Sequence, residues 1–316
     1  MIDRIDTESA VDAMISRGAE VIHEATRFVE QELQSHIIGF VGAFSGGDDS
    51  IVATHMANRS CSDCVVFNAD TMVGLKPTRD HIEKVIDNQK WTAIIERATT
   101  EGPPKKTSTN SEILGNWREG ATAYEDFVLN YGFGGPPMHP RMYQRLKERQ
   151  LMKLRRKLQD GRRGGRLIVI SGIRHDESAI RAGYKRAWHD VPKQGITWVN
   201  PFYDFTAMDF EAYRQEFGLP RNPVKRLCGI SGECCCGTFG SRCERESYRK
   251  ADPKFAEYLD QLELRVKERF PWGWGESPPN WFQQQKSGQK FMWPMLPDEE
   301  LPVFQPMCVG CNNGRR

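Results

Sequence analysis

The stretch of sequence that decides the fold of this chain is Gly42-Ala43-Phe44-Ser45-Gly46-Gly47-Asp48-Asp49-Ser50. An apolar run at 37–41 precedes it, and a helix-like run at 51–57 follows it. A buried strand, a glycine-rich turn and a helix start in that order are typical of a phosphate-binding site. The glycines let backbone N–H groups approach an anion, and the serines add hydroxyl donors. Asp49 is suited to hold the magnesium ion that accompanies a nucleotide.

The pattern Ser-Gly-Gly-x-Asp-Ser at 45–50 lacks the lysine that closes a G-x-x-x-x-G-K-[ST] loop. It resembles the PP-loop of the ATP pyrophosphatase superfamily, whose members cleave ATP between the α and β phosphates. The resemblance implies a site for ATP and Mg²⁺. The residues expected to bind the nucleotide are Ser45, Gly46, Gly47, Asp48, Asp49 and Ser50. The alternative is an ordinary strand–turn–helix whose turn happens to be rich in serine and glycine.

Composition excludes several classes of protein. The 316 residues fit one large or two small domains, and a net charge of +2 makes the whole molecule a weak attractor of polyanions. No stretch approaches the ~20 apolar residues that span a bilayer, so no membrane partner is expected. The first residues, Met1 to Asp6, show no basic region followed by an apolar one. We therefore expect no secretory signal and a cytoplasmic location.

Periodicity along the chain predicts alternating strands and helices. The expected strands are 37–44, 64–70, 91–95, 166–172 and 196–202. The expected helical segments are 8–35, 51–57, 77–89, 111–130, 139–158 and 206–217. This order predicts an α/β fold, a Rossmann-like parallel sheet with helices on both faces. We divide the chain into an N-terminal helical segment (1–35), a nucleotide-binding domain (36–220) and a small cysteine-rich region (221–316).

Two further strand ends carry polar residues that could meet the nucleotide, because ligands bind beyond the carboxyl ends of parallel strands. Asp70 ends the second strand and is expected near the adenosine, with a simple turn acid as the alternative. The fourth strand ends in Ser171-Gly172-Ile173-Arg174. That ending resembles a signature of the phosphoadenosine-phosphosulfate (PAPS) reductase family, in which the arginine meets phosphates or sulfate. We expect Gly172 and Arg174 to bind the nucleotide, and Arg174 and Asp49 to be catalytic.

A basic segment at 141–166 contains eleven Lys and Arg residues against two acids. Such a charge suits a polyanion, so a DNA or tRNA acceptor is one interpretation and a solvated helix face is the other. The residues expected to contact a bound nucleotide or substrate anion, at or just before its start, are His139, Arg145, Lys147 and Arg149.

Seven of the nine cysteines lie in the last third of the chain, which indicates a metal site. The expected ligands are Cys234, Cys236, Cys308 and Cys311, with Cys228 and Cys235 as substitutes. Adenylylsulfate reductases join an adjacent cysteine pair to a distant C-x-x-C, and this resemblance implies a [4Fe–4S] cluster. Zinc is the alternative metal. Cys61 and Cys64 are expected to be a buried structural pair.

The resemblance to the PAPS reductase family stops short of its C-terminal Glu-Cys-Gly-x-His, which this sequence lacks. The intact loop suits ATP. We therefore expect an ATP-dependent, adenylating sulfur-transfer enzyme with an iron–sulfur cluster, similar to the phosphorothioation protein DndC or to tRNA thiolation enzymes. A sulfur donor protein is expected to supply its sulfur. The alternatives are a sulfonucleotide reductase, acting on PAPS or adenylylsulfate, and a non-catalytic nucleotide-sensing module.

Overall fold

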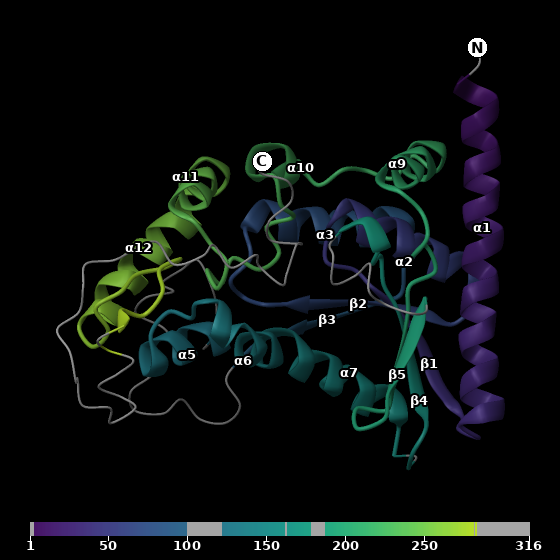
Figure 1. Ribbon diagram of the computed structural model, residues 1–316, viewed down its shortest axis with the longest axis horizontal. Helices are drawn as coiled ribbons and strands as arrows, with labels where there is room; N and C mark the ends of the chain where they lie inside the picture. The colour runs from purple at the N-terminus through teal and green to yellow at the C-terminus, as the bar shows by residue number, and fades with distance from the viewer. Residues whose placement is uncertain (1–2, 100–121, 162, 178–186, 281, 283–316) are drawn as a thin grey trace.

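The structure is a computed structural model that describes residues 3–99, 122–161, 163–177, 187–280 and 282 (Figure 1). Within these residues, six strands form one sheet in the order β3-β2-β1-β4-β6-β5. The strands are β1 (Ile37–Ala43), β2 (Cys64–Asp70), β3 (Ala93–Arg97), β4 (Arg166–Ile170), β5 (Trp188–Val191) and β6 (Ile196–Val199). All neighbours are parallel except β5, which pairs antiparallel with β6. The predicted Rossmann-like α/β fold is confirmed.

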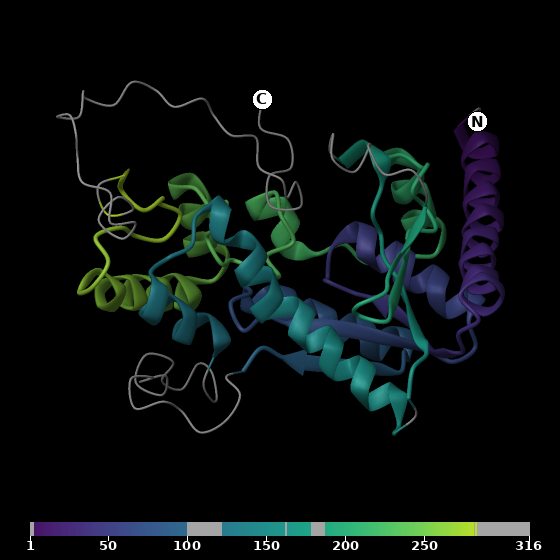
Figure 2. The same cartoon turned by 60° about the horizontal axis from the view of Figure 1, so that its bottom comes forward.

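Helices cover both faces of this sheet (Figures 1 and 2). One face carries α1 (Asp3–Arg27), α2 (Asp48–Ser60), α3 (Lys76–Gln89) and α9 (Ala207–Glu216). The other face carries α7 (Arg149–Gln159), which buries Leu151 and Leu154 against the sheet. No helix in the described part of the chain is long and apolar enough to cross a membrane.

The order of the strands creates the crevice in which a ligand can lie. The chain moves from β1 outward to β2 and β3 and then returns to β4 on the other side of β1. β1 and β4 are paired in register, with Phe40 opposite Ile168 and Gly42 opposite Ile170. Connections that leave adjacent strands in opposite directions open a crevice at the carboxyl ends of those strands. The glycine-rich loop after β1 and the segment after β4 meet there.

Most predicted elements are present, with shifted ends. The expected helix at 139–158 is a continuous helical run composed of α6 (His139–Tyr143), the π-helical turn η4 (Gln144–Glu148) and α7. β3 begins two residues later than expected, at Ala93. β6 ends at Val199, because Asn200 and Pro201 turn the chain away. Of the helical segment expected at 111–130, the described part contains α5 (Ala123–Tyr131), and residues 111–121 lie outside the described residues.

The described part of the cysteine-rich region contains three helices that the sequence did not predict: α10 (Pro223–Cys228), α11 (Arg242–Ala251) and α12 (Pro253–Lys267). They share one apolar cluster with α5 and the connection after β2. Members of this cluster include Val73, Leu75, Tyr124, Phe127, Val224, Phe255, Leu259, Trp272 and Trp274. The boundary near residue 221 stays a prediction, and apolar packing crosses it.

Candidate functional site

The glycine-rich loop joins the carboxyl end of β1 to the first turn of α2. Gly46 has a φ of +75°, and a Cβ there would lie 2.7 Å from Cγ1 of Ile82, so both conformation and space favour glycine. Gly47 is the N-cap of α2. The Ser50 hydroxyl accepts from the N–H groups of Ser45 (3.2 Å) and Gly47 (3.1 Å) and donates to the Gly47 carbonyl (2.9 Å). The loop therefore gathers backbone donors around one point.

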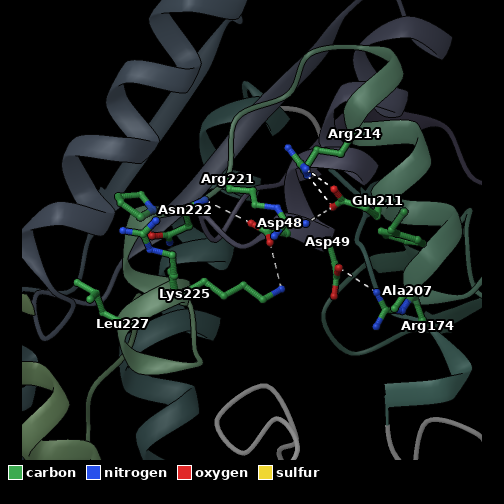
Figure 3. A pocket seen from close by; sticks show the side chains of 13 residues that line it. Asp48, Asp49, Arg174, Ala207, Glu211, Arg214, Arg221, Asn222, Lys225 and Leu227 are labelled. Atoms are coloured by element: carbon green, nitrogen blue, oxygen red, sulfur yellow. Dashed lines mark hydrogen bonds and ion pairs between the residues drawn. The ribbon is translucent and has the colours of Figure 1, made fainter.

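A cleft of about 930 Å³ opens beside this loop, between the start of α2, α9 and α10 (Figure 3). Its charged lining residues are Asp48, Asp49, Arg174, Glu211, Arg214, Arg221, Lys225 and Arg226. Five cations thus face three carboxylates. This cleft, the larger of two that border the loop, therefore favours an anionic ligand. It also offers carboxylates close to the loop.

Arg174 is held rigidly at the wall of the larger cleft. It is 8 % exposed, and its Nη1 donates to Oδ1 of Asp49 at 2.9 Å while its Nε donates to Oδ1 of Asp176 at 2.9 Å. Its guanidinium carbon lies 5.0 Å from the centre of the Phe210 ring. On the other side, Oδ2 of Asp48 lies 3.2 Å from Nζ of Lys225. A fixed guanidinium and an ammonium thus flank the two acids (Figure 3).

The electrostatic surroundings of the acid pair, Asp48 and Asp49, bear on whether it can hold Mg²⁺. Burial raises the pKa of Asp49, and the charges of Arg174 and Lys225 only partly offset that rise. The carboxylate therefore gains from a further cation. Carboxylate oxygens are ligands that Mg²⁺ accepts together with the phosphates of a nucleotide. Asp48 and Asp49 fit that ion in their chemistry.

Gly172 explains how two segments that are distant in sequence come together. A Cβ at this position would lie 2.4 Å from the backbone oxygen of Asp49. The segment after β4 therefore passes directly against the first turn of α2, a contact that a larger residue would push apart. The residues at 45–50, Gly172 and Arg174, which the sequence predicts to bind one nucleotide, all lie around the start of α2.

Ser45 also borders a second, smaller cleft of about 330 Å³ between the sheet and the η4–α7 run. Its apolar walls are formed by Ala43, Phe44, Phe67, Ala69, Leu151, Val169 and Trp198. Polar groups at this cleft include Lys147 and Glu233, whose side chains form an ion pair at 2.6 Å. An apolar pocket with a few fixed polar groups is typical of a site for a flat organic ring.

Asp70 lies at the carboxyl end of β2 but lines neither of these two clefts. Its carboxylate accepts from the N–H of Met72 at 2.9 Å and lies 3.8 Å from both Arg79 and Arg97. These contacts tie the end of β2 to the turn that follows it, to α3 through Arg79 and to the end of β3 through Arg97. Both interpretations of Asp70, a contact to adenosine and a turn acid, stay predictions.

Four residues were expected to meet a bound anion: His139, Arg145, Lys147 and Arg149. Of these, Lys147 borders the smaller cleft. The ring of His139 lies 4.9 Å from that of Phe239, and Arg145 pairs with Asp126 at 3.2 Å. Arg149 is exposed on α7. Ion pairs with Asp126 and Glu233 engage Arg145 and Lys147, and a shared anion site for the four side chains stays a prediction.

Cys234 and Cys236 lie in the turn after α10. A hydrogen bond from Cys234 lowers the pKa of Cys236 below its ordinary value. Within the described residues, no group of three or more His, Cys, Asp or Glu side chains is arranged to hold a metal ion. Of the four expected ligands, Cys234 and Cys236 lie among the described residues. Cys308 and Cys311 lie outside the described residues, so the [4Fe–4S] cluster and its zinc alternative stay predictions.

Sequence reasoning missed the basic wall of the larger cleft, which comes from α9, α10 and the connection between them. Arg221 pairs with Glu211 across this wall, and Lys225 reaches Asp48 from α10. A signal was present: Asn222-Pro223 is an N-cap residue followed by a first-turn proline.

The described residues form a Rossmann-like α/β fold with a glycine-rich loop at the carboxyl end of β1. The sequence profile described as "Phosphoadenosine phosphosulfate reductase domain" matches residues 39–226, more than half of the chain. The chain belongs to this family, as the Gly172–Arg174 signature and the loop predicted. No curated protein matches the chain.

Several solved structures are similar to this one. PAPS reductase from Candida auris in a phosphate complex has 14 % identity and a TM-score of 0.43, covering 69 % of this chain and 90 % of its own. NMN synthetase from Francisella tularensis has 12 % identity and a TM-score of 0.39, covering 92 % and 99 %. The U34-tRNA thiolase NcsA from Methanococcus maripaludis, with its [4Fe-4S] cluster, has 10 % identity and a TM-score of 0.34, covering 87 % and 91 %.

Proposed function

We propose that this protein binds ATP with magnesium and transfers the adenylate group to an acceptor, as the first half of a sulfur-transfer reaction. One observation carries the proposal: Asp48 and Asp49 begin α2 on an intact Ser-Gly-Gly-x-Asp-Ser loop, with Arg174 and Lys225 beside them. Carboxylates suit the metal that accompanies ATP, and the cations suit its phosphates.

The two clefts suggest how one nucleotide would lie. Both border the glycine-rich loop, the smaller through Ser45 and the larger through Asp48 and Asp49. The apolar walls of the smaller cleft suit adenine, and the loop N–H groups suit the α-phosphate. The β and γ phosphates would then enter the larger cleft, where five cations line the wall.

In the adenylation step, an acceptor oxygen attacks the α-phosphorus of ATP. The bond between that phosphorus and the bridging oxygen breaks, and pyrophosphate leaves with the electron pair. Arg174 and Lys225 stabilise the negative charge that develops on the leaving group. Mg²⁺, when bound at Asp48 and Asp49, would neutralise further phosphate charge. AMP on the acceptor is then a good leaving group for a sulfur nucleophile.

Sulfur chemistry is proposed at the cysteine turn. Glu233 borders the smaller cleft, and Cys234 and Cys236 follow it directly. A sulfur donor protein would supply this turn. A cluster would need the further thiols of Cys308 and Cys311.

A DNA or tRNA acceptor would approach the basic segment at 141–166. Several of its cations are engaged in ion pairs, including Arg145, Lys147, Lys157 and Arg166. Its exposed cations include Arg141, Arg149, Arg156 and Arg163. These exposed side chains are the ones proposed to contact the phosphates of the acceptor.

Calorimetry on anaerobically purified protein tests the proposal. The ligands are ATP with Mg²⁺, adenylylsulfate and its 3′-phosphorylated form. We expect ATP with Mg²⁺ to bind most tightly, and Asp49→Asn to weaken that binding selectively. Tighter binding of either sulfonucleotide would contradict an adenylating enzyme.

The second candidate is a sulfonucleotide reductase. Membership in the PAPS reductase domain family favours it, and the cations of the larger cleft suit a sulfate as well as a phosphate. In that case Asp49 would have no metal to hold. The Asp49→Asn variant would then bind sulfonucleotides as well as the unaltered protein does, which separates the two candidates.

A further inference from the structure

Two buried asparagines each hold a backbone carbonyl of the glycine-rich loop. Asn68 lies on β2 and is 4 % exposed, and its Nδ2 donates to the carbonyl of Phe44 at 2.8 Å. Asn222 is the N-cap of α10 and is 2 % exposed, and its Nδ2 donates to the carbonyl of Gly46 at 2.8 Å. The two elements approach the loop from different parts of the sequence.

Holding these carbonyls fixes the direction of two N–H groups. A trans peptide unit is planar, so its C=O and N–H bonds point in opposite directions. The unit that carries the Phe44 carbonyl also carries the N–H of Ser45, and the unit that carries the Gly46 carbonyl also carries the N–H of Gly47. These are the two N–H groups that converge on the Ser50 hydroxyl, at 3.2 and 3.1 Å. Each asparagine thus holds the carbonyl group of a peptide unit whose N–H group points toward the Ser50 hydroxyl.

The Asn222 amide is locked in one orientation. Its Nδ2 also donates to the carbonyl of Ser231 at 2.9 Å, and its Oδ1 accepts from the N–H of Val224 at 2.9 Å. Carbonyl oxygens can only accept, so the NH₂ group must face Gly46 and Ser231. Turning the amide would break these hydrogen bonds in a buried site, which is costly. The Gly46 carbonyl is therefore hydrogen-bonded to an amide group that cannot turn without losing its other hydrogen bonds.

We propose that Asn68 and Asn222 are positioning residues that pre-orient the N–H groups of Ser45 and Gly47 toward a nucleotide phosphate. The inference rests on the proposed function, in which this loop binds the phosphates. A phosphate oxygen is a stronger acceptor than the Ser50 hydroxyl for the same pair of donors. Donors that are already aimed need no reorganisation when the ligand arrives.

Two uncharged variants test the proposal. Asn222→Ser removes the NH₂ donor but keeps an oxygen that can cap α10, and Asn68→Ala removes the second amide. Calorimetry compares ATP with Mg²⁺ against adenosine, which has no phosphate. We expect each variant to weaken ATP binding about tenfold, the equivalent of losing one well-placed hydrogen bond to a charged group. Adenosine binding is expected to change by less than about twofold, because the base site is intact.

A matched control is Asn58→Ala. Its Nδ2 also donates to a backbone carbonyl, that of Thr54 at 2.9 Å, farther along α2. This variant should bind ATP and adenosine as the unaltered protein does. A merely structural role for Asn68 and Asn222 would lower the affinity for both ligands together, and that result would overturn the proposal.

The outcomes separate this proposal from the one on which it rests. If the unaltered protein prefers adenylylsulfate to ATP, adenylation is wrong, and the asparagines are tested with adenylylsulfate against adenosine. If the unaltered protein binds neither nucleotide, both proposals are wrong. If one variant does not fold, the other alone decides, since each amide holds a separate peptide unit.

Discussion

Arg174 and Asp49 form an ion pair, 2.9 Å from Nη1 to Oδ1, that joins the segment after β4 to the first turn of α2. Their side chains are 10 % and 25 % exposed, respectively. The pair stands where the strand order reverses, at the wall of the larger cleft (Figure 3). In the proposed function, Mg²⁺ would therefore take the place of Arg174 beside Asp49, and a phosphate would take the place of Asp49 beside Arg174.

We expect Asp49→Asn to weaken binding of ATP with Mg²⁺ by about tenfold, equivalent to about 1.4 kcal/mol. Binding of ATP without metal should change little, because the lost carboxylate would have contacted the metal. Calorimetry with and without EDTA measures both. Asp176→Asn is the control, since Asp176 pairs with Arg174 but does not line the larger cleft. Equal losses with and without metal would argue against a metal site at Asp49.

Trp198 borders the smaller cleft and should report its occupant. Stacking or contact with adenine is expected to change the intrinsic fluorescence of this indole when ATP binds. Trp198→Phe should lose that change while retaining most of the affinity. The control variant is Trp272→Phe, because Trp272 lies in the apolar cluster and does not line the smaller cleft. This variant should keep the fluorescence change. A fluorescence change that persists in Trp198→Phe would mean that the base binds elsewhere.

Gly172→Ala should damage both stability and binding. Its new Cβ would lie 2.4 Å from the Asp49 backbone oxygen, which is too close for any contact, so the start of α2 must shift. We expect a loss of about 1–3 kcal/mol in the free energy of unfolding, measured with urea. Gly39→Ala is the comparison, because its Cβ would meet Leu158 at an ordinary 3.5 Å. Similar losses in both variants would remove any special role for the Gly172 contact.

Glu125 should make stability depend on pH. It is fully buried, its carboxylate oxygens lack a hydrogen-bond partner among the described residues, and the nearest guanidinium nitrogen, of Arg265, is 3.9 Å away. Burial raises the pKa of Glu125 from 4.5 to about 7. The folded state then binds the proton more tightly than the unfolded state, so stability falls as pH rises from about 4.5 to about 7.

The variant Glu125→Gln removes this titration. We expect it to be more stable than the unaltered protein at pH 8, by on the order of 2–3 kcal/mol, with the advantage shrinking toward pH 5. Urea unfolding across this range measures the effect. If both proteins lose stability in parallel as pH rises, another group causes the dependence.

Cys236→Ser should lower the metal content of anaerobically purified protein, because serine is a poor ligand for iron or zinc. Cys308→Ser should do the same. Cys61→Ser is the control, a buried cysteine far from the turn after α10 in sequence. Elemental analysis for iron and zinc also identifies the metal. An unchanged content in both variants would place the metal on other ligands or leave the protein without one.

The core of the fold was predictable because its signals are local. β1, β2 and β4 lie inside the sheet rather than at its edge, and each contains a run of apolar residues. α9 begins at a Thr206–Asp209 capping box and ends before Gly218, as its stop signals indicate. β5 escaped detection because an edge strand pairs on one side only, and its four residues include His189 and Asp190.

The candidate site was predictable in part for the same reason. Ser45 to Ser50, Gly172 and Arg174 follow strands and carry their own pattern. The role of a lone charge depends on partners that sequence does not reveal. Arg145 has Asp126 as its partner, 19 residues away, and Lys147 has Glu233, 86 residues away. The same limit applies to Asn222, whose contact with Gly46 spans 176 residues.

The apolar cluster that crosses residue 221 has a practical consequence for trimming the protein. Val224 of α10 belongs to that cluster together with Tyr124 and Phe127 of α5. A chain cut near residue 221 would expose these aromatic rings to water and would lose Asn222, one of the two supports of the nucleotide loop. The segment from 39 to 226 that matches the family keeps Asn222 and Val224 but lacks the part of the cluster that α11, α12 and Trp274 supply. A shortened version that keeps this cluster whole has to extend at least through Trp274.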